Sequence, residues 1–223
     1  MKRRELLAVL AAGAIAQVST GEALGSPAKY TKEIELPKPK LSGTVSLEDA
    51  IQRRRSVRRF RSDALPVDSI GQLLWAGQGI TSPDGKRATP SAGALYALEL
   101  YVMTANEVMH YLPHGHRAET RETPDMRPQM QALAVNQTSV GTAPALIAVA
   151  ADPGRLTQRY GARASVYSDI EAGHAAQNML LQAVALGLVA VPVGAVDGPK
   201  AAHALGLPSG QSVVYLIPVG FAA

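Results

Sequence analysis

One segment in the last third of the chain is long, regular and apolar around most of its circumference. The spacing predicts a single helix from Ser165 to Leu188, with apolar residues on nearly every side. A helix of this kind is buried on several sides, so we expect a central core helix that also meets a second subunit. Its polar residues make stable membrane insertion unexpected. Asp169 and Glu171 are expected in its first turns, where carboxylates favour the helix dipole.

Helices and strands alternate along the rest of the chain without the regular rhythm of parallel βαβ units. This pattern predicts an α+β fold, with a mixed, mainly antiparallel sheet flanked by helices around the long central helix. No Gly-x-Gly-x-x-Gly run follows a strand, so a Rossmann dinucleotide site is not supported. The other predicted elements are helices over 46–52, 66–78, 126–135 and 199–205, strands over 95–103, 108–112, 145–150 and 211–219, a strand and loop over 189–195, and polar loops over 81–93 and 114–123.

The first residues have the three-part plan of an export signal. A basic start, Met1 to Glu5, precedes an apolar run from Leu6 to Ala16 and a small, polar tail. The paired Arg3 and Arg4 resemble a twin-arginine signal, which exports folded proteins. We therefore expect residues 1–28 to be a cleaved signal and the protein to be periplasmic. Cleavage after Ala16 and cleavage after Ala28 both fit the sequence.

The remaining chain reads as one domain with a leading segment. Residues 29–45 contain Pro37 and Pro39 among alternating Lys and Glu residues, which indicates an extended arm or linker, and residues 46–223 form the domain. There is no cysteine, so thiolate catalysis and cysteine-ligated metal sites are excluded. The formal net charge of +4 is mild, and the basic residues lack interleaved aromatics. Nucleic acid is therefore not expected as a partner.

Much of the positive charge gathers in one short segment. Six of the nine residues from Arg53 to Arg61 are arginine, and they surround Ser56 at the exit of the predicted 46–52 helix. Guanidinium groups offer forked donors that match phosphate oxygens, and a serine hydroxyl adds one more donor. The segment predicts a site for a small anionic ligand, although a solvated basic face has the same composition.

Three separated motifs resemble the FMN-dependent nitroreductase family. They are Arg54-Arg55-Ser56-Val57-Arg58 with Phe60, then Pro90 to Tyr96, then Val191 to Ala195 with Ile217-Pro218-Val219-Gly220. The run Asp169-Ile170-Glu171-Ala172-Gly173-His174-Ala175-Ala176-Gln177-Asn178 is similar to the SagB/ThcOx-type dehydrogenase branch. The resemblance extends from about Leu47 to Gly220 in the family's order. It implies a nitroreductase-like fold and a homodimer with FMN at the subunit interface.

The resemblance also implies which residues bind the cofactor. Arg54, Arg55, Ser56 and Arg58 are expected to hold the FMN phosphate and ribityl chain, with Arg59 and Arg61 peripheral. The segment Pro90, Ser91, Ala92 and Gly93 is expected beside the flavin of the other subunit. Val193, Gly194 and Ala195 are expected to face the isoalloxazine ring, with a backbone N–H near its N5. Small residues permit such a close approach of backbone to a flat ring.

The implied activity is an FMN-dependent oxidoreductase that moves hydride to or from a conjugated small molecule. NAD(P)H is a possible electron donor. Two alternatives stay open, namely a SagB/ThcOx-type azoline dehydrogenase and a flavin-binding protein without turnover. Azoline-oxidising members carry a Lys-Tyr pair before the long helix, whereas this chain has no lysine between Lys86 and Lys200.

No catalytic acid or base is assigned from the sequence. Tyr160, Tyr167 and His174 are candidates, and a structural role is the favoured interpretation of each. A histidine on a largely buried helix is most simply a hydrogen-bonded core residue. His110, His114 and His116 lack an evident set of further ligands, so no metal site is expected.

Overall fold

The computed structural model describes residues 27–223, and a seven-stranded sheet forms the centre of the molecule. The sheet order is β1-β4-β3-β2-β5-β7-β6, and every neighbouring pair of strands is antiparallel. This confirms the predicted α+β fold with a mainly antiparallel sheet. The strands are β1 (Lys32–Glu35), β2 (Leu98–Met103), β3 (Glu107–Leu112), β4 (Arg117–Glu122), β5 (Ala145–Ala151), β6 (Val189–Ala190) and β7 (Ser212–Gly220).

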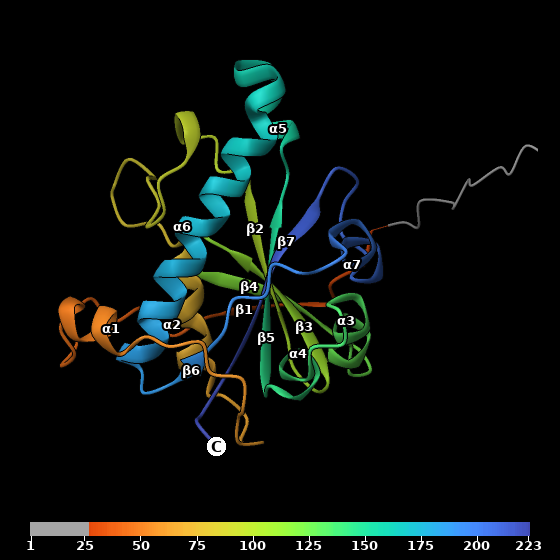
Figure 1. Ribbon diagram of the computed structural model, residues 1–223. Coiled ribbons are helices and arrows are strands. Elements are labelled where there is room, and N and C mark those ends of the chain that lie inside the picture. The colour runs from red at the N-terminus through yellow and green to blue at the C-terminus, as the bar shows by residue number, and fades with distance from the viewer. Residues whose placement is uncertain (1–26) are drawn as a thin grey trace, which may run out of the picture.

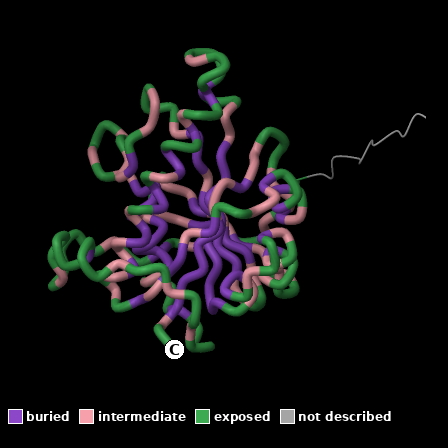
Figure 2. Tube along the Cα trace, viewed as in Figure 1, coloured by how far each residue is buried: buried purple, intermediate pink, exposed green. Residues whose placement is uncertain are grey.

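Helices cover both faces of the sheet (Figure 1). Helices α2 (Val67–Gln78) and α6 (Ala164–Ala185) pack on one face, whereas α3 (Arg127–Leu133), α4 (Thr138–Thr142) and α7 (Gly198–Ala204) pack on the other. Successive side chains of a strand point to opposite faces, so β5, buried along its whole length, supplies both apolar layers. Figure 2 shows this buried centre. Helix α1 (Leu47–Arg53) contacts α6. Helix α5 (Gly154–Tyr160) precedes α6 in the chain.

The central helix lies where the sequence predicts it. Helix α6 buries small and apolar residues against α2 and the sheet, among them Ala172, Ala175 and Met179. It ends at Ala185 with Leu186 as its C-cap, because the residue after the cap, Gly187, takes a left-handed φ of 70°. No acidic residue occupies its first turn, since the helix begins at Ala164. The expected dipole role of Asp169 and Glu171 is therefore wrong.

Two charged segments form strands, although their composition suggested a polar loop and an extended arm. Residues 114–123 were expected to be a loop, but Arg117–Glu122 forms β4, with Ala118 and Thr120 buried between charged neighbours. This alternation is typical of a strand with one solvated face. In the expected arm, Lys32–Glu35 pairs with β4 as the edge strand β1. Edge strands tolerate this many charges because one side has no strand partner.

No helix among residues 27–223 is long and apolar enough to cross a membrane. The predicted signal segment falls almost wholly on residues 1–26, which lie outside the described residues. Residue 28 already belongs to the fold, because its N–H donates to the carbonyl of Gly206 at 2.8 Å.

Candidate functional site

The arginine segment is fixed at both of its ends. Ser46 caps the start of α1 by accepting from the Asp49 N–H at 3.1 Å, as the sequence predicts. Beyond the helix the chain runs extended, and the Val57 N–H donates to the Ala190 carbonyl at 3.1 Å. The N–H of Arg61 donates to the carbonyl of Phe221 at 3.0 Å. The segment thus lies along β6 and the residues after β7.

The arginines of this segment differ in whether their guanidinium groups already form ion pairs or hydrogen bonds. Arg61 pairs with Asp63 at 2.9 Å, and Arg55 donates to the backbone carbonyls of Gln52 and Arg54 at 2.9 and 2.8 Å. Arg54 and Arg58 have no ion pair or hydrogen bond from their guanidinium groups to any residue within 27–223. These two arginines, like Arg53 and Arg59, are therefore available to an anion, while Arg55 also satisfies the last carbonyls of α1.

A small cavity opens beside these arginines at the C-terminal end of α6. Its volume is about 150 Å³, and Arg53, Arg54 and Arg55 line it on one side. Val184 of α6 and the turn at Gly187 line the other. The guanidinium groups that line this cavity and the hydroxyl of the neighbouring Ser56 together fit the phosphate of a nucleotide cofactor, although Arg58 does not line the cavity.

The third motif adjoins the first. Val193 forms two hydrogen bonds with Leu216 of β7, its N–H donating at 2.8 Å and its carbonyl accepting at 3.0 Å. Ser56 forms a β-bridge with Ala190, which lies three residues before Val193 in the chain. At Gly194 a Cβ would lie 3.3 Å from the ring of Tyr215, so the backbone has little space for a side chain there. Within one chain the structure therefore pairs the Arg54–Arg58 segment with Ala190, three residues before Val193–Ala195.

The Pro90–Gly93 segment has a different location. The Ser91 Oγ accepts from the Tyr96 N–H at 2.8 Å and closes a tight turn. Gly93, Ala94 and Tyr96 take left-handed φ values of 61°, 55° and 50°. A Cβ on Gly93 would be 2.9 Å from the Tyr160 hydroxyl. This segment thus packs beside α5 and the start of α6.

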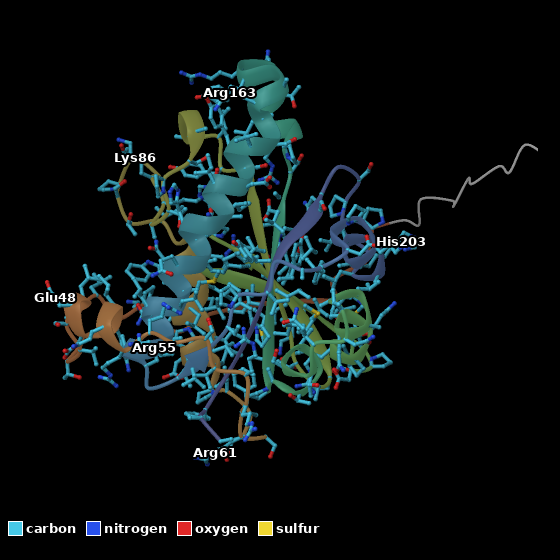
Figure 3. All side chains as sticks on the ribbon, viewed as in Figure 1. Glu48, Arg55, Arg61, Lys86, Arg163 and His203 are labelled. Atoms are coloured by element: carbon cyan, nitrogen blue, oxygen red, sulfur yellow. The ribbon has the colours of Figure 1, made fainter. Side chains whose placement is uncertain are left out.

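Opposite ends of α6 therefore carry the two halves of the expected site. Ser91 lies near Glu171, whereas the arginine cavity contacts Val184. Thirteen residues of helix separate these two positions, which is about 20 Å at a rise of about 1.5 Å per residue. In Figure 3, Arg55 and Arg163 mark these two ends. The described chain does not bring Pro90–Gly93 to the arginines.

Glu171 is a buried acid whose role the sequence analysis missed. Its exposed fraction is 1%, and neither carboxylate oxygen has a hydrogen-bond partner at normal distance among the described residues. Burial raises its pKa, and the neighbouring Ser91 hydroxyl and Ala97 backbone partly oppose the shift. The available signal was helical spacing, because Glu171 falls on the same face as the buried Ser168 and Ala175.

The tyrosine and histidine candidates differ in their environment. Tyr160 and Tyr167 form an edge-to-face pair with centroids 5.0 Å apart, beside Gly93. His174 is exposed, so its interpretation as a core histidine is wrong. His110 lies between Glu99 and Glu119 at 2.9 and 2.8 Å.

The remaining histidines and the carboxylates do not converge on one point. The His116 ring contacts the Tyr111 hydroxyl at 2.9 Å and the Pro37 carbonyl at 3.1 Å. Both ring nitrogens of His110 already face carboxylates. Across residues 27–223 no three His, Asp or Glu residues form a group suited to a metal ion.

Comparison with known proteins identifies the family to which this fold belongs, a family of oxidoreductases. The chain belongs to the nitroreductase family, whose sequence profile matches residues 51–221. It is 36% identical over 171 residues to a protein of Methanocaldococcus jannaschii that is named as a nitroreductase. The match covers 74% of this chain and 85% of that protein.

Solved structures share the fold. A protein from Ralstonia eutropha, likewise assigned to the nitroreductases by name alone, is 28% identical, with a TM-score of 0.79 over 89% of this chain and 94% of its own. The NADPH:FMN oxidoreductase of Vibrio harveyi, solved with NAD+, is 19% identical. Its TM-score is 0.59 over 79% of this chain and 68% of its own, a likeness of fold alone.

Proposed function

We propose that the protein is an FMN-dependent oxidoreductase that transfers hydride to or from a conjugated small molecule. The observation that carries the proposal is the pair Arg54 and Arg58, whose guanidinium groups have no partner among residues 27–223. They lie in a segment that bridges to Ala190, three residues before Val193–Ala195. Membership of the nitroreductase family supports the same conclusion.

The residues of this chain would bind and orient the cofactor. Arg54 and Arg58 would neutralise the phosphate dianion and the Ser56 hydroxyl would donate a hydrogen bond to it, with Arg55 contributing while it caps α1. Val193, Gly194 and Ala195 would face the ring, as the family resemblance implies, since small residues permit a close approach of backbone to a flat ring. The flavin supplies the hydride chemistry when it is bound.

A homodimer would complete the site. Within one chain, Pro90–Gly93 packs near Glu171, about 20 Å along α6 from Val184 at the arginine cavity, so this segment would serve the cofactor of a second copy. Apolar residues spaced four apart are exposed on the helices that a partner would meet. They are Leu47 and Ile51 of α1 (61% and 56% exposed), and Val166 and Ile170 of α6 (48% and 50%).

The proposal extends to the electron donor and to the branch of the family. NAD(P)H is one candidate donor, and a periplasmic or membrane donor is the other. The run around Glu171 and His174 favours the SagB/ThcOx branch, whereas the missing Lys-Tyr pair disfavours azoline oxidation. A flavin-binding protein without turnover is the alternative that donor experiments would separate.

Export to the periplasm, directed by the twin-arginine signal, is proposed on the sequence alone. Loading of a tight cofactor in the cytoplasm is a reason for export in the folded state. Residue 28 is held by Gly206, so cleavage after Ala28 would remove a contact of the folded domain. We therefore favour cleavage after Ala16. The intact mass of the exported protein distinguishes the two sites.

The visible spectrum of the purified domain tests the function. A yellow protein whose flavin is reduced by NADH or NADPH, and reoxidised by a nitroaromatic or quinone, is the expected result. A colourless protein that ignores added FMN would contradict the proposal. A yellow protein that no donor reduces on a catalytic timescale would favour the binding protein without turnover.

A further inference from the structure

We propose that the corner between α5 and α6 is a subsite for the carboxylate of a planar, anionic electron acceptor. This inference rests on the proposed flavin function and names the substrate class. The corner consists of Arg159, Tyr160, Arg163 and Tyr167. It adjoins Pro90–Gly93, the segment proposed to flank the flavin.

A sharp turn creates this corner. Gly161 takes a φ of 52°, which ends α5 and turns the chain into α6. Arg159 stacks over Tyr160 at 5.6 Å, and Arg163 stacks over Tyr167 at 5.0 Å. The Arg163 Nε also donates to the Tyr167 hydroxyl at 3.0 Å. Two guanidinium groups are thus held on two aromatic rings that contact each other edge to face.

The charge of this corner has no counter-ion within the described chain. Neither Arg159 nor Arg163 forms an ion pair there, although both are exposed. The nearby carboxylates are engaged elsewhere, since Glu99 and Asp152 both pair with Arg155. Glu171 is buried with a raised pKa, which makes it a poor counter-ion for either arginine.

The contact with Gly93 connects this charge to the proposed flavin. A Cβ there would lie 2.9 Å from both the Arg159 Nη1 and the Tyr160 hydroxyl. A glycine at 93 therefore lets the arginine and the tyrosine reach the segment. A substrate lying flat on the ring would meet the guanidinium donors at its rim and the tyrosine rings at its edge. Fixed, stacked guanidinium groups suit a carboxylate, which they can bind in a bidentate fashion.

Paired acceptors of equal shape test the proposal. The flavin is first reduced with dithionite, and its reoxidation by 4-nitrobenzoate or by the neutral 4-nitrobenzamide is followed by absorbance. The acceptor concentration at half-maximal rate should be about tenfold lower for the benzoate, as expected for one or two charge-assisted hydrogen bonds. The variant Arg159→Gln with Arg163→Gln should lose this preference and leave the benzamide unaffected.

A matched control removes the same charge elsewhere. Lys32→Gln with Lys38→Gln changes two exposed lysines of the β1 region and should retain the preference. Saturation-transfer NMR of benzoate against benzamide on the apoprotein gives a readout that needs no flavin. Arg159→Lys keeps the charge without the planar fork and should retain only part of the preference.

The possible failures are distinguishable. If the wild-type protein is flavin-loaded and reduces both acceptors equally well, the subsite is refuted and the oxidoreductase function stands. The subsite is also refuted if the double arginine variant alters only the response to NADH or NADPH, because the anion would then belong to the donor. If the protein never binds FMN, the proposed function fails, and the NMR comparison still decides whether the corner binds a carboxylate.

Discussion

Removing Arg54 and Arg58 together should release the flavin. Both guanidinium groups lack partners within residues 27–223, so their replacement by alanine leaves no buried carboxylate unpaired. The change should therefore act on cofactor binding and leave the fold intact. This separation makes the pair the most direct test of the proposed site.

The expected magnitude follows from the number of charged contacts. A hydrogen bond to a charged group contributes about 1.5–3 kcal/mol, so two lost contacts weaken binding by about 3 kcal/mol at the lower limit. At about 1.4 kcal/mol per tenfold, this corresponds to a Kd increased by roughly 100-fold. We take the lower limit because Arg58 is exposed and salt screens its charge.

The assay is a fluorescence titration, in which binding to the apoprotein quenches free FMN. The control variant, Arg59→Ala with Arg61→Ala, removes the same two charges from the same segment. Arg61 already pairs with Asp63, and both residues are expected to be peripheral, so its Kd should change by less than about threefold. Equal weakening in the two double variants would show that general charge, and not these two positions, holds the phosphate.

Three further predictions concern buried groups. Burial raises the pKa of Glu171, so the folded chain keeps this proton at pH values where the unfolded chain has lost it. As pH rises above the ordinary carboxyl range, the free energy of unfolding of the wild-type protein should therefore fall relative to that of the Glu171→Gln variant. Urea unfolding at a series of pH values measures this difference. Burial alone would lower the pKa of His110, but the Glu99 and Glu119 carboxylates raise it. His110→Gln should therefore cost about 3 kcal/mol near about pH 6 and less as pH rises through the folded pKa, and a pH-independent cost would contradict this. At Gly77 a Cβ would lie 2.9 Å from Leu100 and 3.1 Å from Met179, so Gly77→Ala should lower the free energy of unfolding by about 1 kcal/mol. The same change at Gly173, where a Cβ meets open space, should raise it by about 0.5–1 kcal/mol.

Local sequence signals predicted most of the elements. The apolar spacing of α6, the cap at Ser46 and the hairpin of β2 with β3 each depend on residues close together in the chain. Such signals are decided by periodicity and by side-chain hydrogen bonds to the nearby backbone. The arginine segment was likewise evident from composition, because guanidinium groups keep their charge in any fold.

The charged strands were harder to predict. Strand β4 became a strand because its neighbours β1 and β3 accept its hydrogen bonds, although only Ala118 and Thr120 turn inward. A sequence does not contain the register of such distant partners. Composition alone therefore favoured a polar loop.

The division of the site between the two ends of α6 required the tertiary structure. The order of the motifs gives no distance, and only the packing of Ser91 beside Glu171 and of Arg54 beside Val184 separates them. The sequence determined which groups are charged, small or apolar. The fold decided which arginines lack a partner among residues 27–223, as Arg54 and Arg58 do, and which are already paired, as Arg61 is. The physical reason is that a charge belongs to a residue, whereas its partner depends on which distant segments pack against it.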